Sequence, residues 1–248
     1  MLGMILPAGV ECEERFGEAP SGVLFPAEEK IIAQAVEQRR REYATVRSCA
    51  RACLERLGYA PVAILPGDGG APTWPAGVLG SMTHCTGYAA AAVGPLPQIS
   101  AIGIDAEPDS PLPDGVLDLI ATPAERDRLP VAQPRPGGPN WDRLLFSAKE
   151  AVYKAWFPLV GEWLDHQEAE IRFHPHERTF TAQLSRDGLI IDRRQIHRLH
   201  GRWIRKHGIL ATAVVLGRRS LACPLQAWPA WPSSPPRRPR RQPGYPPQ

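Results

Sequence analysis

The order of the predicted helices and strands is the feature of this sequence that most constrains its fold. Residues 27–57 have a helical pattern, and so do residues 113–129 and 141–157. Short strand candidates follow each helical region, near 78–83, 88–93 and 101–105 and then near 169–174, 178–185, 201–206 and 209–216. Helices followed twice by short antiparallel strands predict an α+β fold.

Proline and glycine indicate where these elements end. A turn-rich loop at 66–77 precedes the first three strands, which we expect to form a β-meander. A linker rich in proline and glycine at 130–139 separates the two later helices. The second of these should end at Phe157-Pro158, because a proline disfavours the helical conformation of the residue before it.

We expect three parts in the chain: an N-terminal half at 1–112, a C-terminal half at 113–225 and a tail at 226–248. The tail consists mostly of proline, arginine, serine and glutamine, so it should be disordered or polyproline-like. Its four arginines exceed the formal net charge of +3, and it contains no acidic residue. The remainder of the chain is therefore close to neutral.

The sequence favours a cytoplasmic protein. Its N-terminus lacks the basic start of a signal peptide, and apolar stretches such as 209–216 are too short to span a bilayer. The five cysteines are scattered, which is typical of free thiols in a reducing compartment. Cys49 and Cys53 have no second pair at ligand spacing, which argues against a zinc site.

Asp105 and Glu107 form the first candidate site. They are two residues apart in a predicted strand, so both side chains point to one face, while Ile102 and Ile104 point to the other. Neighbouring carboxylates repel each other unless a cation lies between them, and a divalent ion with oxygen ligands is a common solution. The alternative is a pair of solvated acids before the turn at Pro108.

The second candidate site lies in the helix at 141–157. Glu150 and Lys154 are four residues apart and share one helix face, close to a buried side. A partly buried Lys–Glu pair beside two acids could bind a metal-bound polyphosphate. The pattern Ser147-x-x-Glu150 also matches a capping box, and a Glu-to-Lys pair at this spacing is common on surfaces.

The third candidate site is Ser81-Met82-Thr83-His84, at the end of a predicted strand. A single histidine is usually a partly exposed side chain without a special role. The sequence contains no G-x-S-x-G motif around Ser81, which argues against a serine hydrolase. It also lacks the glycine-rich motifs of P-loop and Rossmann nucleotide sites.

The three sites together resemble the Sfp/EntD-type 4'-phosphopantetheinyl transferases. The resemblance rests on SMTH at 81–84, GIDAE at 103–107 and FSAKEAVYKAW at 146–156, with RRREYATVRSCAR at 39–51 and WPAGV at 74–78. These motifs occur in order and at familiar spacing. The match extends from about residue 5 to residue 216.

The resemblance implies a fold and a reaction. The fold would be a pseudo-twofold pair of similar halves, with Mg²⁺ and coenzyme A bound in the cleft between them. The enzyme would transfer the 4'-phosphopantetheine arm of coenzyme A to a serine of an apo acyl or peptidyl carrier protein and release 3',5'-ADP. The serine of the partner would be the nucleophile, which agrees with the absence of a nucleophile–base pair in this sequence.

The resemblance also implies roles for individual residues. The metal carboxylates would be Asp105, Glu107 and Glu150. The catalytic residues would be Glu150, Lys154 and Asp105. Coenzyme A would contact Arg39, Arg47, Thr83, His84, Lys149 and Lys154. One departure concerns the loop before Trp74, where relatives commonly have a basic residue and this chain has Gly69. Coenzyme A would then lose one contact to its 3'-phosphate, unless the loop is indifferent or needs a glycine for its backbone.

Two other functions remain open on the sequence alone. Another Mg²⁺-dependent phosphoryl or nucleotidyl transferase could use the same carboxylates. A module that binds nucleic acid or an acidic protein could use the arginines of the tail and of 39–41, but the near-neutral body argues against it. We expect a monomer that modifies carriers of fatty-acid, polyketide or nonribosomal-peptide synthases, without nucleic-acid or membrane partners.

Overall fold

The computed structural model describes residues 1–17, 22–129, 137–185, 189–191 and 194–217. The helices are α1 Pro26–Ile32, α2 Glu37–Arg56, α3 Val116–Ile120, α4 Pro123–Arg128 and α5 Trp141–Val160, with 3₁₀ turns η1 Leu2–Ile5, η2 Asp68–Gly70 and η3 His166–Glu168. The strands are β1 Glu11–Phe16, β2 Val78–Cys85, β3 Tyr88–Pro95, β4 Ile99–Pro108, β5 Ala169–His174, β6 Thr179–Leu184, β7 Leu189–Ile191, β8 Arg194–Ile196, β9 Arg198–Lys206 and β10 Ile209–Gly217. All strand pairs are antiparallel, which confirms the expected mixture of helices and antiparallel sheet.

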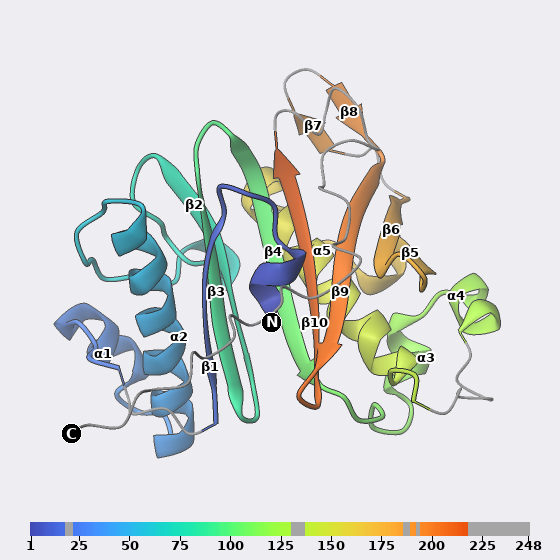
Figure 1. Cartoon of the computed structure of the whole chain (residues 1–248), viewed down its shortest axis with the longest axis horizontal. Helices are drawn as coiled ribbons and strands as arrows, with labels where there is room; N and C mark the ends of the chain where they lie inside the picture. The colour runs from blue at the N-terminus through green and yellow to red at the C-terminus, as the bar shows by residue number, and fades with distance from the viewer. Residues whose placement is uncertain (18–21, 130–136, 186–188, 192–193, 218–248) are drawn as a thin grey trace, which may run out of the picture.

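The strands form two main sheets, each with a long helix beside it (Figure 1). The first has the order β1-β3-β2 and packs against α2. The second has the order β4-β10-β9-β6-β5, with α5 behind β4 and β10 in the view of Figure 1 and η1 in front of them. The pair β7-β8 is separate. Strands β4 and β10 are therefore covered on both faces, which explains their continuous apolar sequences.

The expected meander is wrong at its third strand. Strand β4 pairs with β10 instead of β3, so it belongs to the sheet of the C-terminal strands. Two hydroxyl groups join it to β2: the Ser81 Oγ accepts from the Ile104 N–H at 3.1 Å, and the Thr83 Oγ1 accepts from the Ala106 N–H at 3.0 Å. We call this junction between the two sheets the seam. At the seam a side-chain hydroxyl accepts the hydrogen bond of a backbone N–H. In a continuous sheet a backbone carbonyl of the neighbouring strand would accept it.

Helix α5 packs closely against β4 at a glycine. Its buried apolar residues are Leu144, Leu145, Ala148, Ala151, Val152, Ala155 and Trp156. A Cβ on Gly103 would lie 1.9 Å from the carbonyl oxygen of Ala151, so only glycine fits at this crossing. The helix continues to Val160, and the expectation that it ends at Phe157 is wrong. Pro158 lies inside its last turn, and Gly161 ends it in the left-handed conformation.

Other boundaries also differ from the expectation. The predicted helix at 113–129 is two short helices, because Ala121 is extended and Thr122 caps α4 with Pro123 in its first turn. Strands β1, β7 and β8 were not predicted from the sequence. Most of the predicted linker and the whole tail at 226–248 lie outside the described residues. In the described part of the chain, none of the helices combines the length and apolarity needed to cross a membrane.

Candidate active site

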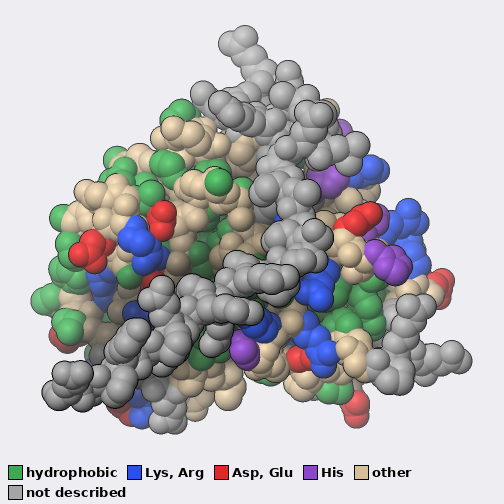
Figure 2. Space-filling view, in the orientation of Figure 1, with side chains coloured by type: hydrophobic (Ala, Val, Ile, Leu, Met, Phe, Trp, Pro, Cys, Tyr) green, Lys and Arg blue, Asp and Glu red, His purple; other side chains and the backbone are tan. Residues whose placement is uncertain are grey.

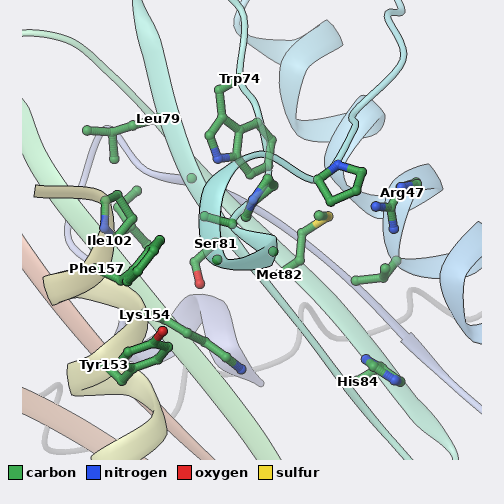
Figure 3. Close-up of a pocket in the computed structure, with 18 of the residues that line it drawn as sticks. Arg47, Trp74, Leu79, Ser81, Met82, His84, Ile102, Tyr153, Lys154 and Phe157 are labelled. Carbon is green, nitrogen blue, oxygen red and sulfur yellow. The ribbon is translucent and has the colours of Figure 1, made fainter. Parts of the chain in front are cut away.

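A pocket of about 540 Å³ takes its walls from α1, α2, β2, β4 and α5 and from the loop before β2. Figure 3 shows Tyr153, Lys154 and Phe157 on one side of it and Arg47 on the other, with residues of β2 between them. Trp74, Leu79, Met82, Ile102 and Phe157 supply apolar surface. The pocket therefore has an apolar body with charged groups at separate positions, the usual composition of a small-molecule site.

Two arginines and a histidine lie along one wall of the pocket. Arg47 is buried and lies over the ring of Tyr43, 3.1 Å from its centroid, and its Nε donates to the carbonyl oxygen of Ile64 at 2.9 Å. Burial lowers the pKa of Arg47 to about 10, so it stays charged at neutral pH. The Nη1 of Arg39 lies 2.7 Å from the Nε2 of His84. Burial lowers the pKa of His84, and the Arg39 guanidinium lowers it further.

Asp105 and Lys154 form an ion pair between β4 and α5. The Lys154 Nζ donates to the Asp105 Oδ1 at 2.7 Å, and Lys154 lines the pocket. The Thr83 hydroxyl also lies 3.3 Å from this oxygen. Asp105 is almost fully buried, and its second oxygen, Oδ2, has no hydrogen-bond partner among the described residues. A buried carboxylate oxygen without a partner is unusual and is a natural point for a ligand atom to bind.

Glu107 points to the same side of β4 as Asp105, as the strand alternation predicts. It accepts a hydrogen bond from the Arg143 Nη1 of α5 at 3.0 Å. Burial raises the pKa of Glu107, and repulsion by Asp105 raises it further, whereas Arg143 opposes both effects. The two carboxylates therefore remain unfavourable neighbours even with a cationic side chain on each.

Glu150 lines the pocket one turn before Lys154. Its Oε1 lies 3.1 Å from the Nε2 of His166, which follows α5 in the chain. Burial alone would raise the pKa of Glu150, but His166 and Lys154 outweigh it, so the pKa is below its ordinary value. Glu150 is thus an anion at neutral pH.

Lys149, Thr83 and Glu107 are predicted site residues that do not line the pocket, and Lys149 lies furthest from the predicted role. Its ammonium group is buried on another side of α5 and contacts the Glu125 Oε2 at 2.9 Å and two backbone carbonyls. Thr83 is close to Asp105, but its hydroxyl belongs to the seam. Arg39, Arg47, His84, Glu150 and Lys154 line one pocket, and Asp105 joins them through Lys154.

The three predicted metal carboxylates are not gathered into one cluster. Among the residues that the structure describes, no three acidic, histidine or cysteine side chains are placed to hold a metal together. Their chemistry nevertheless fits Mg²⁺, which prefers oxygen ligands. Each of Asp105 and Glu107 already pairs with a cationic side chain, but the Oδ2 of Asp105 has no partner among the described residues and the pKa of Glu107 is raised, so this pair still has room for a cationic ligand.

The sequence did not single out two further residues of the site, Arg143 and His166. Arg143 lies seven residues before Glu150, so both lie on one side of α5, and this spacing could have indicated it. His166 lies beyond α5 in η3, and no spacing rule connects it with Glu150. Tyr153 and Phe157, which line the pocket, follow the same helical face.

Comparison with known proteins identifies the family and the reaction class. The model of the 4'-phosphopantetheinyl transferase N-terminal domain matches residues 27–94, and that of the 4'-phosphopantetheinyl transferase superfamily matches residues 101–212. This chain belongs to the 4'-phosphopantetheinyl transferase superfamily. It is a transferase, and the resemblance seen in its motifs is confirmed.

Individual relatives agree over most of the chain. The 4'-phosphopantetheinyl transferase Svp of Streptomyces mobaraensis is 47% identical over 219 residues, which cover 87% of this chain and 89% of the relative. PptT of Mycobacterium tuberculosis, also a 4'-phosphopantetheinyl transferase, is 43% identical over 224 residues, or 87% and 98% of the two chains. Enterobactin synthase component D of Escherichia coli K12 is 36% identical over 129 residues, which cover 50% of this chain and 58% of the relative.

Proposed function

We propose that this transferase moves the 4'-phosphopantetheine arm of coenzyme A to a serine of an apo acyl or peptidyl carrier protein and releases 3',5'-ADP. The observation that carries the proposal is the Asp105–Lys154 pair at the edge of a pocket whose opposite wall holds Arg39, Arg47 and His84. Cations on two sides of an apolar pocket suit a ligand with separated phosphates and an organic body.

Coenzyme A would bind with its phosphates toward these cations. Arg47 is buried and already oriented by Tyr43 and Ile64, so little side-chain entropy is lost when it binds an anion. Arg39 and His84 lie together and would share a second phosphate group. Trp74 and Met82 supply apolar surface for the base or the arm.

The reaction needs charge neutralisation and positioning more than covalent catalysis. The carrier serine forms a bond to the β-phosphorus, and the bond from that phosphorus to the oxygen of the departing 3',5'-ADP breaks. Glu150, an anion in the free enzyme, accepts the serine proton. Lys154 stabilises the negative charge that develops on the leaving group. Mg²⁺ held by Asp105, Glu107 and Glu150 would supply further positive charge at the pyrophosphate.

The two alternative functions are less well supported. In Figure 2 basic and acidic side chains are interspersed on the face shown, which does not resemble the continuous basic surface of a nucleic-acid-binding module. A nucleotidyl transferase would use similar carboxylates, but the curated relatives are named for phosphopantetheinyl transfer.

Several finer expectations remain part of the proposal. We infer a pseudo-twofold arrangement of the halves 1–112 and 113–225 with the site between them, in a monomeric cytoplasmic enzyme. A relative named as a component of enterobactin synthase supports carriers of biosynthetic synthases as partners. Thr83 remains a proposed contact of coenzyme A, although its side chain does not point freely into the pocket. Lys149 is not included among the proposed contacts, because its ammonium group is fully paired on another side of α5.

Intact-mass spectrometry tests the reaction directly. The purified chain is incubated with coenzyme A, Mg²⁺ and a panel of apo carrier proteins. We expect at least one carrier to gain the mass of the phosphopantetheine arm, while Asp105→Ala gives no gain and keeps a wild-type thermal melt. A gain equal to a nucleotidyl group, or no gain with any carrier, would refute the proposed reaction.

A further inference from the structure

Lys149 and Glu125 form a buried ion pair that connects α4, α5 and the segment after α5. Both side chains are only 1% exposed. The Lys149 Nζ contacts the Glu125 Oε2 and donates to the carbonyl oxygens of His166 and Ala169, so its three protons have three acceptors. Glu125 in turn accepts from the backbone N–H groups of Thr122 and Ile171. A buried pair is tolerated only when it is satisfied in this way.

The residue that this pair anchors is His166. Its carbonyl oxygen accepts from Lys149, its ring stacks on Phe146 with centroids 6.0 Å apart and planes at 14°, and its Nε2 contacts Glu150. Phe146, Lys149 and Glu150 are spaced three and four residues apart, so they form one strip along α5. His166 is therefore fixed at three points over this strip. Because an ionised carboxylate only accepts hydrogen bonds, Nε2 must be the donor to Glu150.

From these contacts we propose that His166 is a positioning residue for Glu150, and that the Lys149–Glu125 pair holds His166 in place. The inference rests on the proposed function, in which Glu150 accepts the serine proton and helps to hold the metal. His166 fixes one carboxylate oxygen and leaves the other to act in the pocket. Lys149 thus acts through His166 and does not touch the substrate.

A matched pair of variants separates the hydrogen bond from the packing. His166→Phe keeps a ring on Phe146 but removes the donor, whereas His166→Gln keeps a donor near the Nε2 position. We expect His166→Phe to lower kcat about tenfold to hundredfold with little change in the KM for coenzyme A, because partners of metal-binding carboxylates have effects of about this size. His166→Gln should recover most of the loss. His176→Phe, at an exposed position, is the control.

Binding of Mn²⁺, measured by titration calorimetry with coenzyme A present, gives a readout that needs no carrier protein. We expect His166→Phe to lower the affinity for Mn²⁺, whereas His166→Gln should have nearly the affinity of the wild type. The inference is overturned if the Phe and Gln variants are equally impaired, or if both match the wild type in kcat and Mn²⁺ affinity. A wild type that binds Mn²⁺ in this way but modifies no carrier would refute the proposed function and not the positioning role.

The anchoring pair needs a test that separates positioning from stability. Lys149→Met alone should lower the melting temperature, because it leaves Glu125 charged, buried and unpaired. The double variant Lys149→Met with Glu125→Gln removes both charges and should melt closer to the wild type. It still lacks the donor to the His166 carbonyl, so we expect kcat to fall about tenfold, as in His166→Phe. A double variant with wild-type kcat would show that the pair does not position His166.

Discussion

His84 is the pocket residue whose charge should respond most directly to coenzyme A. Its pKa is below the ordinary histidine value in the free protein, because burial of the ring and the nearby Arg39 outweigh the Glu42 carboxylate, whose Oε2 lies 3.3 Å from the His84 Nε2. Below about pH 6.5 the unfolded chain binds a proton at His84. The folded chain binds that proton only at a lower pH, so the free energy of unfolding decreases as the pH falls below about 6.5. A bound phosphate would reverse the shift by favouring the imidazolium.

We therefore predict proton uptake when coenzyme A binds at about pH 6. Calorimetric titrations in buffers of different ionisation enthalpy measure this uptake as a difference in apparent binding heat. At about pH 8 the uptake should vanish, because the imidazole is then neutral in both states. His84→Gln should bind coenzyme A without the uptake. If that variant takes up as many protons as the wild type, the responsible group is not His84.

Gly69 shows why a departure from a family pattern needs a structure to interpret it. The sequence left three possibilities: a lost contact to the 3'-phosphate, a glycine required by the backbone, or a loop in which the residue at this position is indifferent. Gly69 has a φ of 58°, and a Cβ there would lie 2.2 Å from the Phe157 ring. The second possibility is the one that the structure favours.

We predict that Gly69→Lys lowers the stability of the fold and weakens the binding of coenzyme A, because it displaces Phe157 from the pocket wall. Gly70→Lys is the matched control: Gly70 also has a positive φ, 80°, but a Cβ there meets no atom within 4 Å. Both variants should lose about 1 kcal/mol of stability, because lysine does not favour a positive φ. Only Gly69→Lys should also suffer the clash with Phe157. Thermal melts and coenzyme A titrations compare them. Equal losses in the two variants would show that Phe157 is not the obstacle.

The two lysines of the KEAVYK motif show how much of a site can be predicted from spacing. Lys149 and Lys154 are five residues apart, which places them about 140° apart around a helix, so they could not both face one pocket. Lys154 and Asp105 could be predicted, because strand and helix periodicities select their faces. The partner of Lys149 could not be predicted, because Glu125 lies on a separate helix and only tertiary packing brings the two side chains together.

At the scale of secondary-structure elements, the crossing of α5 and β4 positions the chemistry. Asp105 and Glu107 lie on β4, and Lys154 and Arg143 face them from α5. Gly103 permits this close approach, since any side chain would meet the Ala151 carbonyl. The glycine of the GIDAE motif is thus explained by packing and not by contact with a ligand.

Gly103→Ala should therefore destabilise the fold by about 3 kcal/mol or more, because the helix or the strand must move to admit a methyl group. Urea denaturation measures the loss, and carrier modification should fall with it. Gly3→Ala serves as the control, because its nearest neighbour would lie 3.9 Å away, and its effect should stay within about 0.5 kcal/mol. Similar stabilities for the two variants would contradict the close crossing.

The bounds of an element could be predicted where signals in the local sequence determine them. The partner of a strand could not be predicted in this way, because it depends on distant parts of the chain. Strand β5 agrees with its prediction because its apolar alternation and the turn after it are local signals. The partner of β4 was mispredicted, because sequence proximity favours β3, whereas the observed pairing with β10 joins residues more than a hundred positions apart. Pro158 stays inside α5 because a proline in the last turn removes only one hydrogen bond before Gly161 ends the helix.

At the scale of the whole molecule, the question is whether the tail at 226–248 contributes to the activity of the enzyme. The pocket and both sheets lie within residues 1–217. We predict that deletion of residues 229–248 leaves kcat, the KM for coenzyme A and the melting temperature unchanged. The deletion also removes four arginines, so adhesion to anionic surfaces should decrease. A large loss of carrier modification would show that the tail takes part in recognising the partner.

The seam decides how the two sheets are placed relative to each other. The pocket takes Ser81 and His84 from one sheet and Ile102 from the other, so its shape depends on this junction. At the Thr83 position a single hydroxyl accepts from the Ala106 N–H and also contacts Asp105. Thr83 therefore connects the alignment of the sheets with the orientation of the carboxylate that Lys154 holds.

Thr83→Val removes this hydroxyl at nearly constant volume, whereas Thr83→Ser keeps it and removes only a methyl group. The valine variant leaves the buried Ala106 N–H without an acceptor, which should cost about 1–3 kcal/mol in urea denaturation. Coenzyme A affinity should fall as well, because Asp105 loses a neighbour and the two walls of the pocket lose their alignment. The serine variant should retain both the affinity and most of the stability. If valine and serine have the same effect, the methyl group matters and the hydroxyl does not, and the sheets must then be aligned by their apolar packing alone.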